Sequence, residues 1–356
     1  MERTMTSRGQ HTFAEIMSQA TAWSAALAEF QGRVEQVQAA WDDAAPTRVL
    51  FTGCGSTYYL SLIAASILQG LTGIPARGVP ASELVLFPHH VTADPGRTLL
   101  VAISRSGTTS ETIAAVSRFR QMGGRRVWCV TCYPDTPLAQ ESDLVLPAEA
   151  AQEESVAQTR SFSTMLVLVQ ALAATVAHEP LDALFSLPPA GEALLEATAG
   201  EMEGLGNRLE LCRYFFLGSG PQYGVACEAM LKLKEMSITH SEAYHALEFR
   251  HGPKAMVDGE TLAVGLLSRR AFDHERAVLM ETGEMAATIL ALSPAEPIAG
   301  AINVQLPTAL PEWTLPPLYL PPLQLLAYHR AMAKGLDPDR PRHLEAVVVL
   351  DPDSLA

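Results

Sequence analysis

One stretch of the chain concentrates side chains that can move protons. Residues 228–235 read EAMLKLKE, and residues 237–258 read SITHSEAYHALEFRHGPKAMVD, with three histidines and several carboxylates. The first stretch is helical by propensity, so Lys232 and Glu235, three residues apart, share one helix face. A carboxylate, a lysine and a histidine brought together suit proton transfer next to a carbonyl. A surface helix with ion pairs explains the KLKE pattern equally well, so both interpretations stay open at this point.

Two groups of residues raise the question of a metal site. The histidines of the second stretch lack the H-x-x-x-H or H-E-x-x-H spacing that holds two ligands on one helix face. Cys129 and Cys132 have the C-x-x-C spacing, but the surrounding VWCVTC is typical of a buried strand. No second cysteine pair stands nearby to complete a zinc site. We therefore expect core cysteines, no metal and no other cofactor.

Another stretch has the chemistry of an anion site. Residues 104–112 read SRSGTTSET, directly after the apolar run 99–103 and before a predicted helix over residues 111–122. Backbone N–H groups and hydroxyls at a helix N-terminus can converge on a phosphate dianion, and Arg105 could add a charge-assisted contact. The alternative is a set of helix caps facing solvent. The hydroxyls, glycine and arginine at one strand end favour phosphate.

The loop GCGST at residues 53–57 is a candidate second wall of the same site. A G-x-G pattern is weak evidence, because it also forms simple strand-to-helix turns. It is no dinucleotide fingerprint, since the third glycine and the following acidic residue are missing. It is no P-loop either, since the lysine is absent.

The elements that must position these loops recur along the chain. RVLFTGCGSTYY at residues 48–59 corresponds to RYFFLGSGPQYG at residues 213–224. Two further apolar runs recur in the same order and at nearly the same spacing: 99–104 with 262–268, and 126–131 with 287–293. Short apolar runs separated by helix-length segments are typical of parallel strands buried on both faces. We predict an α/β fold of two tandem, doubly wound parallel-sheet (flavodoxin-like) subdomains.

This organisation divides the chain into four parts. They are an N-terminal helical segment over residues 1–45, a first domain over 46–178, a second domain over 190–335 and a C-terminal tail over 336–356. Further elements are expected within and between them: helices over 13–38, 159–176 and 323–334, a linker over 179–189, a loop or strand over 307–322, and a strand over 346–350.

Composition and charge limit the function. The chain has 356 residues, a formal net charge of −14 and 48% hydrophobic residues. Such acidity argues against binding to nucleic acid or to an anionic membrane surface. We find no signal peptide and no apolar window of the roughly 18 residues that a membrane span needs. Five scattered cysteines favour a reducing compartment, so we expect a cytoplasmic protein.

The motifs together resemble the sugar isomerase (SIS) domain family. The resemblance is strongest to the isomerase half of glucosamine–fructose-6-phosphate aminotransferase and to stand-alone amino-sugar-phosphate deaminases and isomerases. Five motifs carry it in family order: GCGST (53–57), SRSGTTSET (104–112), ESDLVLP (141–147), EAMLKLKEMSITHSEAYHALEFRHGP (228–253) and KGLDPDRPRHL (334–344).

The resemblance implies roles for individual residues. The sugar phosphate would be bound by Ser56, Thr57, Ser104, Arg105, Ser106 and Thr109, although family members often have glutamine in place of Arg105. Glu235 matches the acid/base that moves a proton between C1 and C2, and Lys232 matches a lysine that assists it. His251 matches the histidine that opens the sugar ring, which in the family is donated by the neighbouring subunit and implies a homodimer.

Two departures from the aminotransferase favour breakdown of an amino sugar over its synthesis. Met1 is followed by Glu2, with no nucleophilic cysteine and no glutaminase half before the first domain. The tail lysine that forms a Schiff base in the family aligns with Ala346, and alanine cannot form an imine. The stretch SVAQTRSFSTM (155–165) resembles the deaminases and isomerases, and it implies Gln158 as a further substrate contact.

We therefore expect an amino-sugar 6-phosphate deaminase/isomerase, an enzyme whose substrate is a hexose 6-phosphate. A fructosamine 6-phosphate deglycase and a plain ketose–aldose isomerase are the alternatives. A non-catalytic sugar-phosphate-binding regulator ranks below them, because Glu235, Lys232 and His251 are all present. No separate basic helix-turn-helix segment indicates DNA binding.

Overall fold

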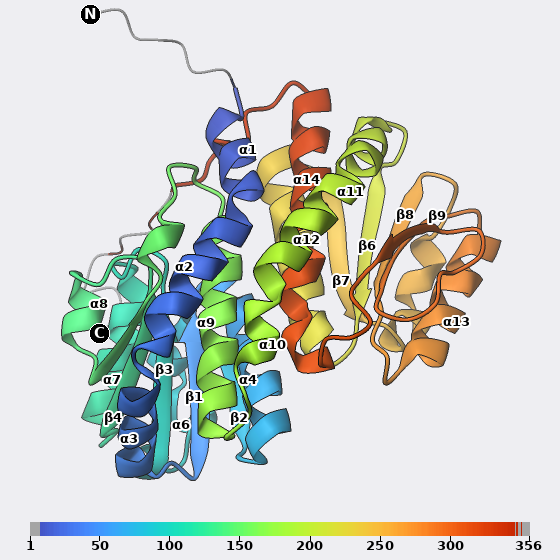
Figure 1. Cartoon of the computed structure of the whole chain (residues 1–356). Coiled ribbons are helices and arrows are strands. Elements are labelled where there is room, and N and C mark those ends of the chain that lie inside the picture. The colour runs from blue at the N-terminus through green and yellow to red at the C-terminus, as the bar shows by residue number, and fades with distance from the viewer. Residues whose placement is uncertain (1–7, 346, 348–349, 351–356) are drawn as a thin grey trace, which may run out of the picture. The chain divides into compact units, whose positions relative to one another are not determined.

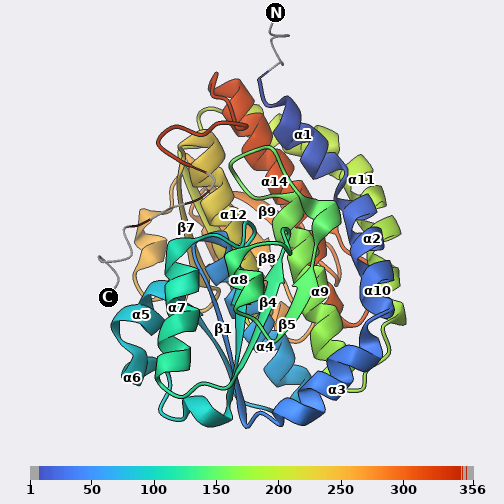
Figure 2. The same ribbon diagram turned by 90° about the vertical axis from the view of Figure 1, so that its left-hand side faces the viewer.

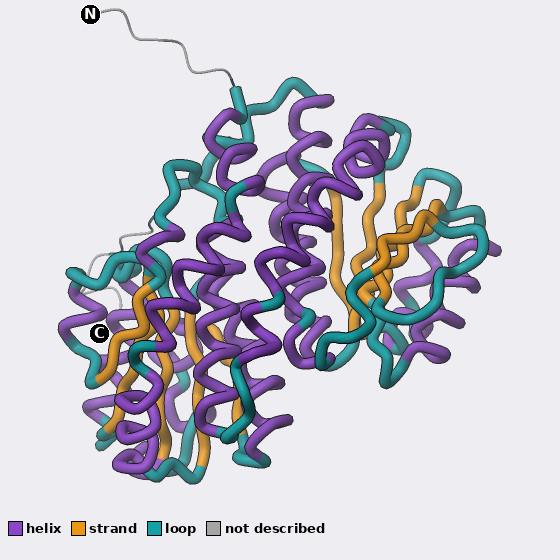
Figure 3. The backbone as a smooth tube through the Cα atoms, viewed as in Figure 1, coloured by secondary structure: helices purple, strands orange, loops and turns teal. Residues whose placement is uncertain are grey.

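The computed structural model describes residues 8–345, 347 and 350, which form two compact units (Figure 1). Of the described residues, the sheet A unit comprises Thr21–Gln152 and Ser161–Pro188. The sheet B unit comprises residues 8–20, Glu153–Arg160 and residues 189–345. In both units the strands lie among helices (Figure 3).

Sheet A has five parallel strands in the order β2-β1-β3-β4-β5. Its strands are β1 (Arg48–Gly53), β2 (Ala76–Pro80), β3 (Thr98–Ile103), β4 (Arg126–Thr131) and β5 (Leu144–Pro147). The central strand β3 is buried along its whole length, as its continuous apolar sequence predicts.

Sheet B also has five parallel strands, in the order β10-β9-β8-β6-β7. Its strands are β6 (Arg213–Gly218), β7 (His240–His245), β8 (Thr261–Leu266), β9 (Thr288–Ser293) and β10 (Ile302–Gln305). From β7 to β10, this order matches that of sheet A from β2 to β5. The predicted fold of two doubly wound parallel sheets is confirmed, and in each sheet the strand order reverses once, between β1 and β3 or between β6 and β8.

The helices of the sheet A unit surround its strands (Figure 2). They are α2 (Gln19–Gln31), α3 (Val34–Ala44), α4 (Ser56–Thr72), α5 (Ala81–Leu86), α6 (Pro88–Val91), α7 (Ser110–Gln121), α8 (Pro137–Gln140), α9 (Arg160–Val176) and α10 (Asp182–Phe185), with 3₁₀ turns at Pro95–Arg97 and Glu149–Ala151. Leu84, Leu100 and Phe119 belong to one buried cluster that joins α5, β3 and α7.

The sheet B unit has fewer but longer helices. They are α1 (Gln10–Met17), α11 (Leu187–Asn207), α12 (Pro221–Ser237), α13 (Phe272–Glu284) and α14 (Pro316–Ala333), with 3₁₀ turns η3 (Glu248–Arg250), η4 (Pro253–Met256) and η5 (Glu312–Thr314). Helix α14 packs along α12, and Phe215, Phe249 and Leu279 share a buried cluster next to β8.

Three expectations about helices need correction. The helix expected over residues 13–38 is three helices, α1 to α3. The linker expected over 179–189 contains α10 and the first turn of α11. The helix expected from residue 323 begins at Pro316, so Pro321 and Pro322 lie inside α14. Proline is tolerated in the first turn of a helix. The free energy gained by burying nearly the whole of α14 outweighs the destabilisation by the two internal prolines.

The segment after α12 also differs from expectation. The sequence indicated a helical turn, a loop and a second helix over residues 237–258, but the chain forms the edge strand β7 followed by η3 and η4. Pairing with β6 from Arg213↔His240 to Gly218↔His245 makes this polar stretch a strand. The strand expected over 346–350 lies mostly outside the described residues.

In the part of the chain that the structure describes, none of the helices is both long enough and apolar enough to span a bilayer.

Candidate active site

The loops after β1 and β3 lie beside the reversal of strand order in sheet A, where doubly wound sheets bind their ligands. The loop after β1 leads into α4, and the loop after β3 leads into α7. The loop after β1 contacts the first turn of α7, because the Cys54 sulfur lies 3.5 Å from the Thr112 hydroxyl. The predicted phosphate-binding residues of both loops are therefore brought together at one end of sheet A.

The loop of residues 104–109 is curled around its own hydroxyl groups. The buried Ser104 hydroxyl accepts the Gly107 N–H (3.1 Å) and lies 3.3 Å from the Thr109 hydroxyl. The Ser106 hydroxyl accepts both the N–H (3.2 Å) and the hydroxyl (3.1 Å) of Thr108. This curl gathers three of the predicted phosphate contacts just before the first turn of α7.

Gly107 and the Arg105 backbone anchor this loop to the elements beside it. Gly107 has φ +64°, and a Cβ there would lie 2.0 Å from the Thr136 hydroxyl oxygen, so the position requires glycine. The Arg105 carbonyl accepts the Cys132 N–H (3.1 Å) and the Thr131 hydroxyl (3.2 Å). The loop is thus held against the end of β4.

The loop of residues 53–57 is a tight turn closed by Thr57. The Thr57 hydroxyl accepts the Cys54 N–H and donates to the Cys54 carbonyl, both at 2.9 Å. A Cβ on Gly53 would lie 2.5 Å from the Thr57 hydroxyl oxygen, so only glycine fits beneath it. The hydroxyl of Thr57 therefore closes the turn, and its contact with a ligand stays a prediction. Ser56 is buried at the start of α4.

A row of three charged side chains runs along α12. Glu228, Lys232 and Glu235 are spaced four and three residues apart and share one helix face. The Lys232 ammonium contacts a Glu235 carboxylate oxygen and lies 3.4 Å from a Glu228 carboxylate oxygen. The predicted pairing of Lys232 with Glu235 is confirmed. Glu228 was missed, although its position four residues before Lys232 was a signal for it.

The three side chains of this row differ in their exposure to solvent. Lys232 is 1% exposed and Glu228 is fully buried, whereas the side chain of Glu235 is 19% exposed. Burial lowers the pKa of Lys232, but the adjacent Glu228 and Glu235 carboxylates outweigh it and hold the pKa above its ordinary value. Lys232 is therefore a fixed ammonium, and Glu235 is the member of the row that a ligand can reach.

This row lies at the opposite end of its own sheet from the end at which the predicted phosphate loops follow the strands of sheet A. Helix α12 connects the parallel strands β6 and β7 and packs on both, so it runs antiparallel to them. Lys232 and Glu235 stand near its end, just before the chain enters β7. They therefore lie toward the amino ends of the strands of sheet B, away from the reversal of strand order at the other end.

His251 follows η3 and is exposed to solvent. Its side chain makes no hydrogen bond or ion pair with any other residue that the structure describes. Its neighbours are fixed, because Arg250 forms two hydrogen bonds of 2.6 and 3.1 Å with Glu281 on α13. The residue before this exposed imidazole is thus anchored to α13.

The other two histidines of this segment take no part in the row. The His245 ring stacks on Tyr223 with a centroid distance of 3.8 Å, and burial lowers its pKa. His240 begins β7 and is exposed.

Gln158 lies in the loop Glu153–Arg160 of the sheet B unit. A buried carboxylate on α1 shapes this loop: Glu15 accepts the N–H groups of Glu154 (2.7 Å) and Ser155 (3.2 Å) and the Ser155 hydroxyl. The amide oxygen of Gln158 is buried and has no hydrogen-bond partner among the described residues. It is therefore available to a ligand.

The C-terminal KGLDPDRP stretch supports that loop. The Asp339 carboxylate accepts the N–H and the hydroxyl of Thr12, both at 2.7 Å, at the first turn of α1. The Asp339 carbonyl accepts the Val156 N–H (3.1 Å). This family motif thus holds together α1 and the loop that carries Gln158.

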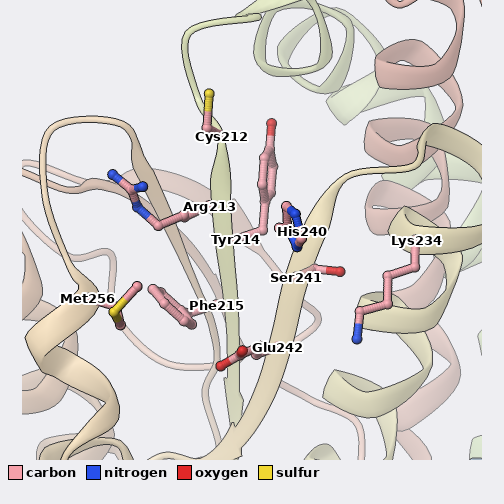
Figure 4. A pocket seen from close by; sticks show the side chains of 9 residues that line it. All are labelled: Cys212, Arg213, Tyr214, Phe215, Lys234, His240, Ser241, Glu242 and Met256. Carbon is pink, nitrogen blue, oxygen red and sulfur yellow. The ribbon is translucent and has the colours of Figure 1, made fainter.

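A separate pocket of about 420 Å³ lies at the amino ends of β6 and β7 (Figure 4). Arg213, Phe215 and Met256 lie on one side of these strands, and Ser241 and Lys234 lie on the other. None of the side chains that we predicted to bind or convert a substrate lines this pocket. Arg213 is already paired with Asp258.

We also searched for metal ligands. Within residues 8–345, no three histidine, cysteine, aspartate or glutamate side chains are grouped as a metal site would need. Cys129 and Cys132 are buried and form no disulfide, and burial raises the pKa of Cys129 to about 12. They are core residues, as the sequence predicted.

Comparison with known proteins identifies the family. Residues 44–175 and 212–333 match the family model described as the SIS domain. The chain belongs to the SIS domain family.

Curated relatives of this SIS domain protein include the isomerizing glutamine–fructose-6-phosphate aminotransferases. That of Pseudomonas aeruginosa is 35% identical over 321 residues, which cover 85% of this chain and 52% of the relative. That of Legionella pneumophila (strain Lens) is 34% identical over 308 residues, which cover 84% of this chain and 50% of the relative. The chain spans about half the length of the curated relatives it matches.

Solved structures of similar length also resemble this SIS domain protein. Glucosamine-6-phosphate deaminase from Thermotoga maritima has a TM-score of 0.84 and 30% identity, covering 96% of this chain and 100% of that one. Tagatose-6-phosphate ketose/aldose isomerase from Escherichia coli has a TM-score of 0.86 and 25% identity, covering 93% and 95%. The expected family and the expectation of an enzyme are confirmed.

Proposed function

We propose that this SIS domain protein is an amino-sugar 6-phosphate deaminase that converts glucosamine 6-phosphate, or a similar sugar, into a ketose 6-phosphate and ammonia. The observation that carries the proposal is the row on α12. There a partly exposed carboxylate, Glu235, contacts an ammonium, Lys232, that burial and two carboxylates keep in place. Such a carboxylate suits the removal and return of a proton next to a carbonyl.

The phosphate group would bind at the sheet A loops. The Ser104, Ser106 and Thr109 hydroxyls lie just before the first turn of α7, whose N-terminal N–H groups favour an anion. Ser56, Thr57 and Arg105 would complete this site, and the Thr57 hydroxyl also closes the β1–α4 turn. Gln158, with its free amide oxygen, would contact the sugar.

The proton transfer would proceed in three steps. His251 opens the sugar ring and exposes the C1 aldehyde. Glu235 removes the proton from C2, which carries the amine, and the electrons form a C1–C2 double bond with the negative charge on the C1 oxygen. Glu235 then returns the proton to C1 while the amine nitrogen gives up a proton to the C1 oxygen, so that C1 becomes the CH₂OH group and C2 an imine. The Lys232 ammonium would stabilise the negative charge that develops near Glu235.

Hydrolysis of the imine completes the reaction. Water adds to C2, the C–N bond breaks, ammonia leaves, and C2 becomes the carbonyl carbon of the ketose. Two observations favour deamination. The similarity to a glucosamine-6-phosphate deaminase covers all of that chain. In addition, the aminotransferase lysine that forms a Schiff base with the ketose aligns with Ala346, a position outside the described residues.

A ketose–aldose isomerase is the second candidate, favoured by the structural similarity to tagatose-6-phosphate ketose/aldose isomerase. It would use Glu235 in the same way on a substrate without the amine. A fructosamine 6-phosphate deglycase is a third candidate with the same first steps.

We also infer a homodimer in which His251 serves the partner's site. The exposed imidazole, fixed at its neighbours but free at its ring, supports this inference. A cytoplasmic location remains a prediction from the scattered free cysteines.

The test is ammonia release from purified protein given glucosamine 6-phosphate, galactosamine 6-phosphate or a fructosamine 6-phosphate. Ammonia with fructose 6-phosphate or tagatose 6-phosphate would support deamination and would identify the sugar epimer. Isomerisation of a ketose 6-phosphate without ammonia from any amine would support the isomerase instead. The Glu201→Gln variant, which changes an exposed glutamate on α11, is the matched control for Glu235→Gln.

A further inference from the structure

The reversal of strand order in sheet B, between β6 and β8, repeats the geometry of the phosphate loops of sheet A. In both sheets a glycine in an unusual conformation precedes the helix after the first strand. Gly55 has φ 55° and ψ −123°, and Gly220 has φ 57° and ψ −133°. Gly53 and Gly218 also match, because a Cβ on either would lie 2.5 Å from a residue in the first turn of that helix.

The loops after the third strands of this pattern, β3 and β8, share a second feature. Ser268 accepts the N–H of Ala271 with its hydroxyl at 3.0 Å, three residues ahead, as Ser104 does with Gly107 at 3.1 Å. Both loops then enter a helix, α13 or α7. Sheet B therefore has the backbone of a second anion site at the equivalent position.

In sheet B this position already contains a negatively charged side chain. Glu275, in the first turn of α13, is 3% exposed. One of its carboxylate oxygens accepts the Ser268 N–H at 2.6 Å and the Ser268 hydroxyl at 3.0 Å. Ser219, in the loop after β6, also lies close enough to this carboxylate to lower its pKa. Ser268 thus holds one oxygen of a buried carboxylate that the loop after β6 also approaches.

We propose that Glu275 is a built-in anion that occupies the second strand-order reversal and keeps ligand phosphate out of it. A carboxylate presents acceptor oxygens to N–H and hydroxyl donors, as a phosphate oxygen does. Because the carboxylate is covalently attached, it is present at a high effective concentration and excludes a free anion from these donors.

This assignment has a consequence for ligand binding that rests on the proposed function. Each chain binds one phosphosugar, at the sheet A loops, although its fold provides two equivalent positions. Titration of the wild-type protein with fructose 6-phosphate is expected to give one site per chain, and two sites per chain would overturn the proposal. Absence of any binding would count against the proposed function, while the test of Glu275 below would still apply.

The direct test removes the built-in carboxylate and supplies a free one. Glu275→Ala leaves the Ser268 N–H and hydroxyl without their acceptor, so we expect its melting temperature to fall by roughly 3 °C or more. Sodium formate should then raise the melting temperature of Glu275→Ala more than that of the wild type, with sodium chloride at equal ionic strength as the reference. Inorganic phosphate tests whether the opened position also accepts a larger anion.

Two variants serve as controls. Glu284→Ala removes an exposed carboxylate from the same helix and should show no specific response to formate. Glu275→Gln removes the charge but keeps the side-chain volume, so formate should not stabilise it beyond the chloride reference. Equal effects of formate and chloride on Glu275→Ala, or equal formate stabilisation of Glu275→Gln, would overturn the proposal. If Glu275→Ala is insoluble, refolding it in the presence of formate should recover soluble protein. The proposal would also be contradicted if Glu275→Gln refolds to soluble protein but Glu275→Ala does not do so in formate.

Discussion

Sheets A and B have the same strand order, yet the loops at their reversal points differ in chemistry. In sheet A the loop SRSGTT contributes hydroxyls and no carboxylate, and Gly107 allows it to curl before α7. In sheet B the loop LSRRA is one residue shorter and its serine binds Glu275. We propose that the first position binds the phosphate of the ligand and that the carboxylate of Glu275 fills the second.

The difference shows that topology alone does not make a binding site. The shared strand order places two loops side by side and builds the glycine turn before the following helix. Which of the two positions binds a phosphate depends on a few side chains in those loops. In the proposed function, the sheet B unit supplies the groups for proton transfer, Glu235 and Lys232 of α12, with Glu228 beside them.

The largest expected effect tests this division between binding and catalysis. Glu235→Gln removes the proposed acid/base while leaving the phosphate loops of the other unit intact. We expect turnover of the amino sugar phosphate to fall by about 10²–10⁴-fold, as for other general acid/base residues. Titration with fructose 6-phosphate should give an affinity within a few-fold of the wild type. Loss of binding together with activity would contradict the separate roles.

Neutralising the buried ammonium is the next largest change. Lys232→Met leaves the fully buried Glu228 carboxylate without its cation, which typically costs about 3–5 kcal/mol of stability. Adding Glu228→Gln should recover most of that stability but little of the activity, as measured by denaturant unfolding and ammonia release. Lys234→Met, two residues away and exposed, is the matched control and should resemble the wild type. Full activity in the double variant would remove Lys232 from the mechanism.

A pair of glycine substitutions compares the two sheets directly. Gly55→Ala and Gly220→Ala each introduce a Cβ at a positive φ where no other atom lies closer than about 4 Å. Backbone strain should therefore cost about 1–3 kcal/mol in both. Only Gly55→Ala should also raise KM for the phosphosugar, because only its loop borders the proposed phosphate site. Equal effects of the two substitutions on KM would contradict the prediction that only the Gly55 turn borders the substrate.

The smallest effect concerns the pH dependence of stability. Burial raises the pKa of Glu275 above its ordinary value near 4.5, although hydrogen bonds from Ser268 and Ser219 oppose the shift. The folded protein then binds this proton more tightly than the unfolded chain does, so the contribution of Glu275 falls as the pH rises from 4.5 through the higher native value. Glu275→Gln should remove this contribution. Melting curves of both proteins between about pH 4.5 and 7 would show parallel profiles if the prediction is wrong.

The sequence predicted the fold well where the pattern was strong. Continuous apolar runs identified β1, β3, β4, β6, β8 and β9, because strands buried on both faces have no polar side chains to obscure them. It failed at the edge strand β7, whose polar residues are exposed on one side and resemble a loop. It also placed the start of α14 too late, because burial of that helix outweighs its prolines.

The candidate site could be predicted only in part for a similar reason. Lys232 and Glu235 were identified because their spacing places them on one helix face. The carboxylate of Glu228 was missed, since nothing local shows that this face is buried. The role of Glu275 needed the three-dimensional approach of the loops after β6 and β8, which no spacing along the chain predicts.

The most direct test of the account is the ratio of products formed from glucosamine 6-phosphate by the wild-type enzyme. Ammonia and fructose 6-phosphate should be measured in the same reaction as a function of time. The account predicts that both are formed, in equal amounts. Binding of glucosamine 6-phosphate without release of ammonia would contradict the proposed deamination.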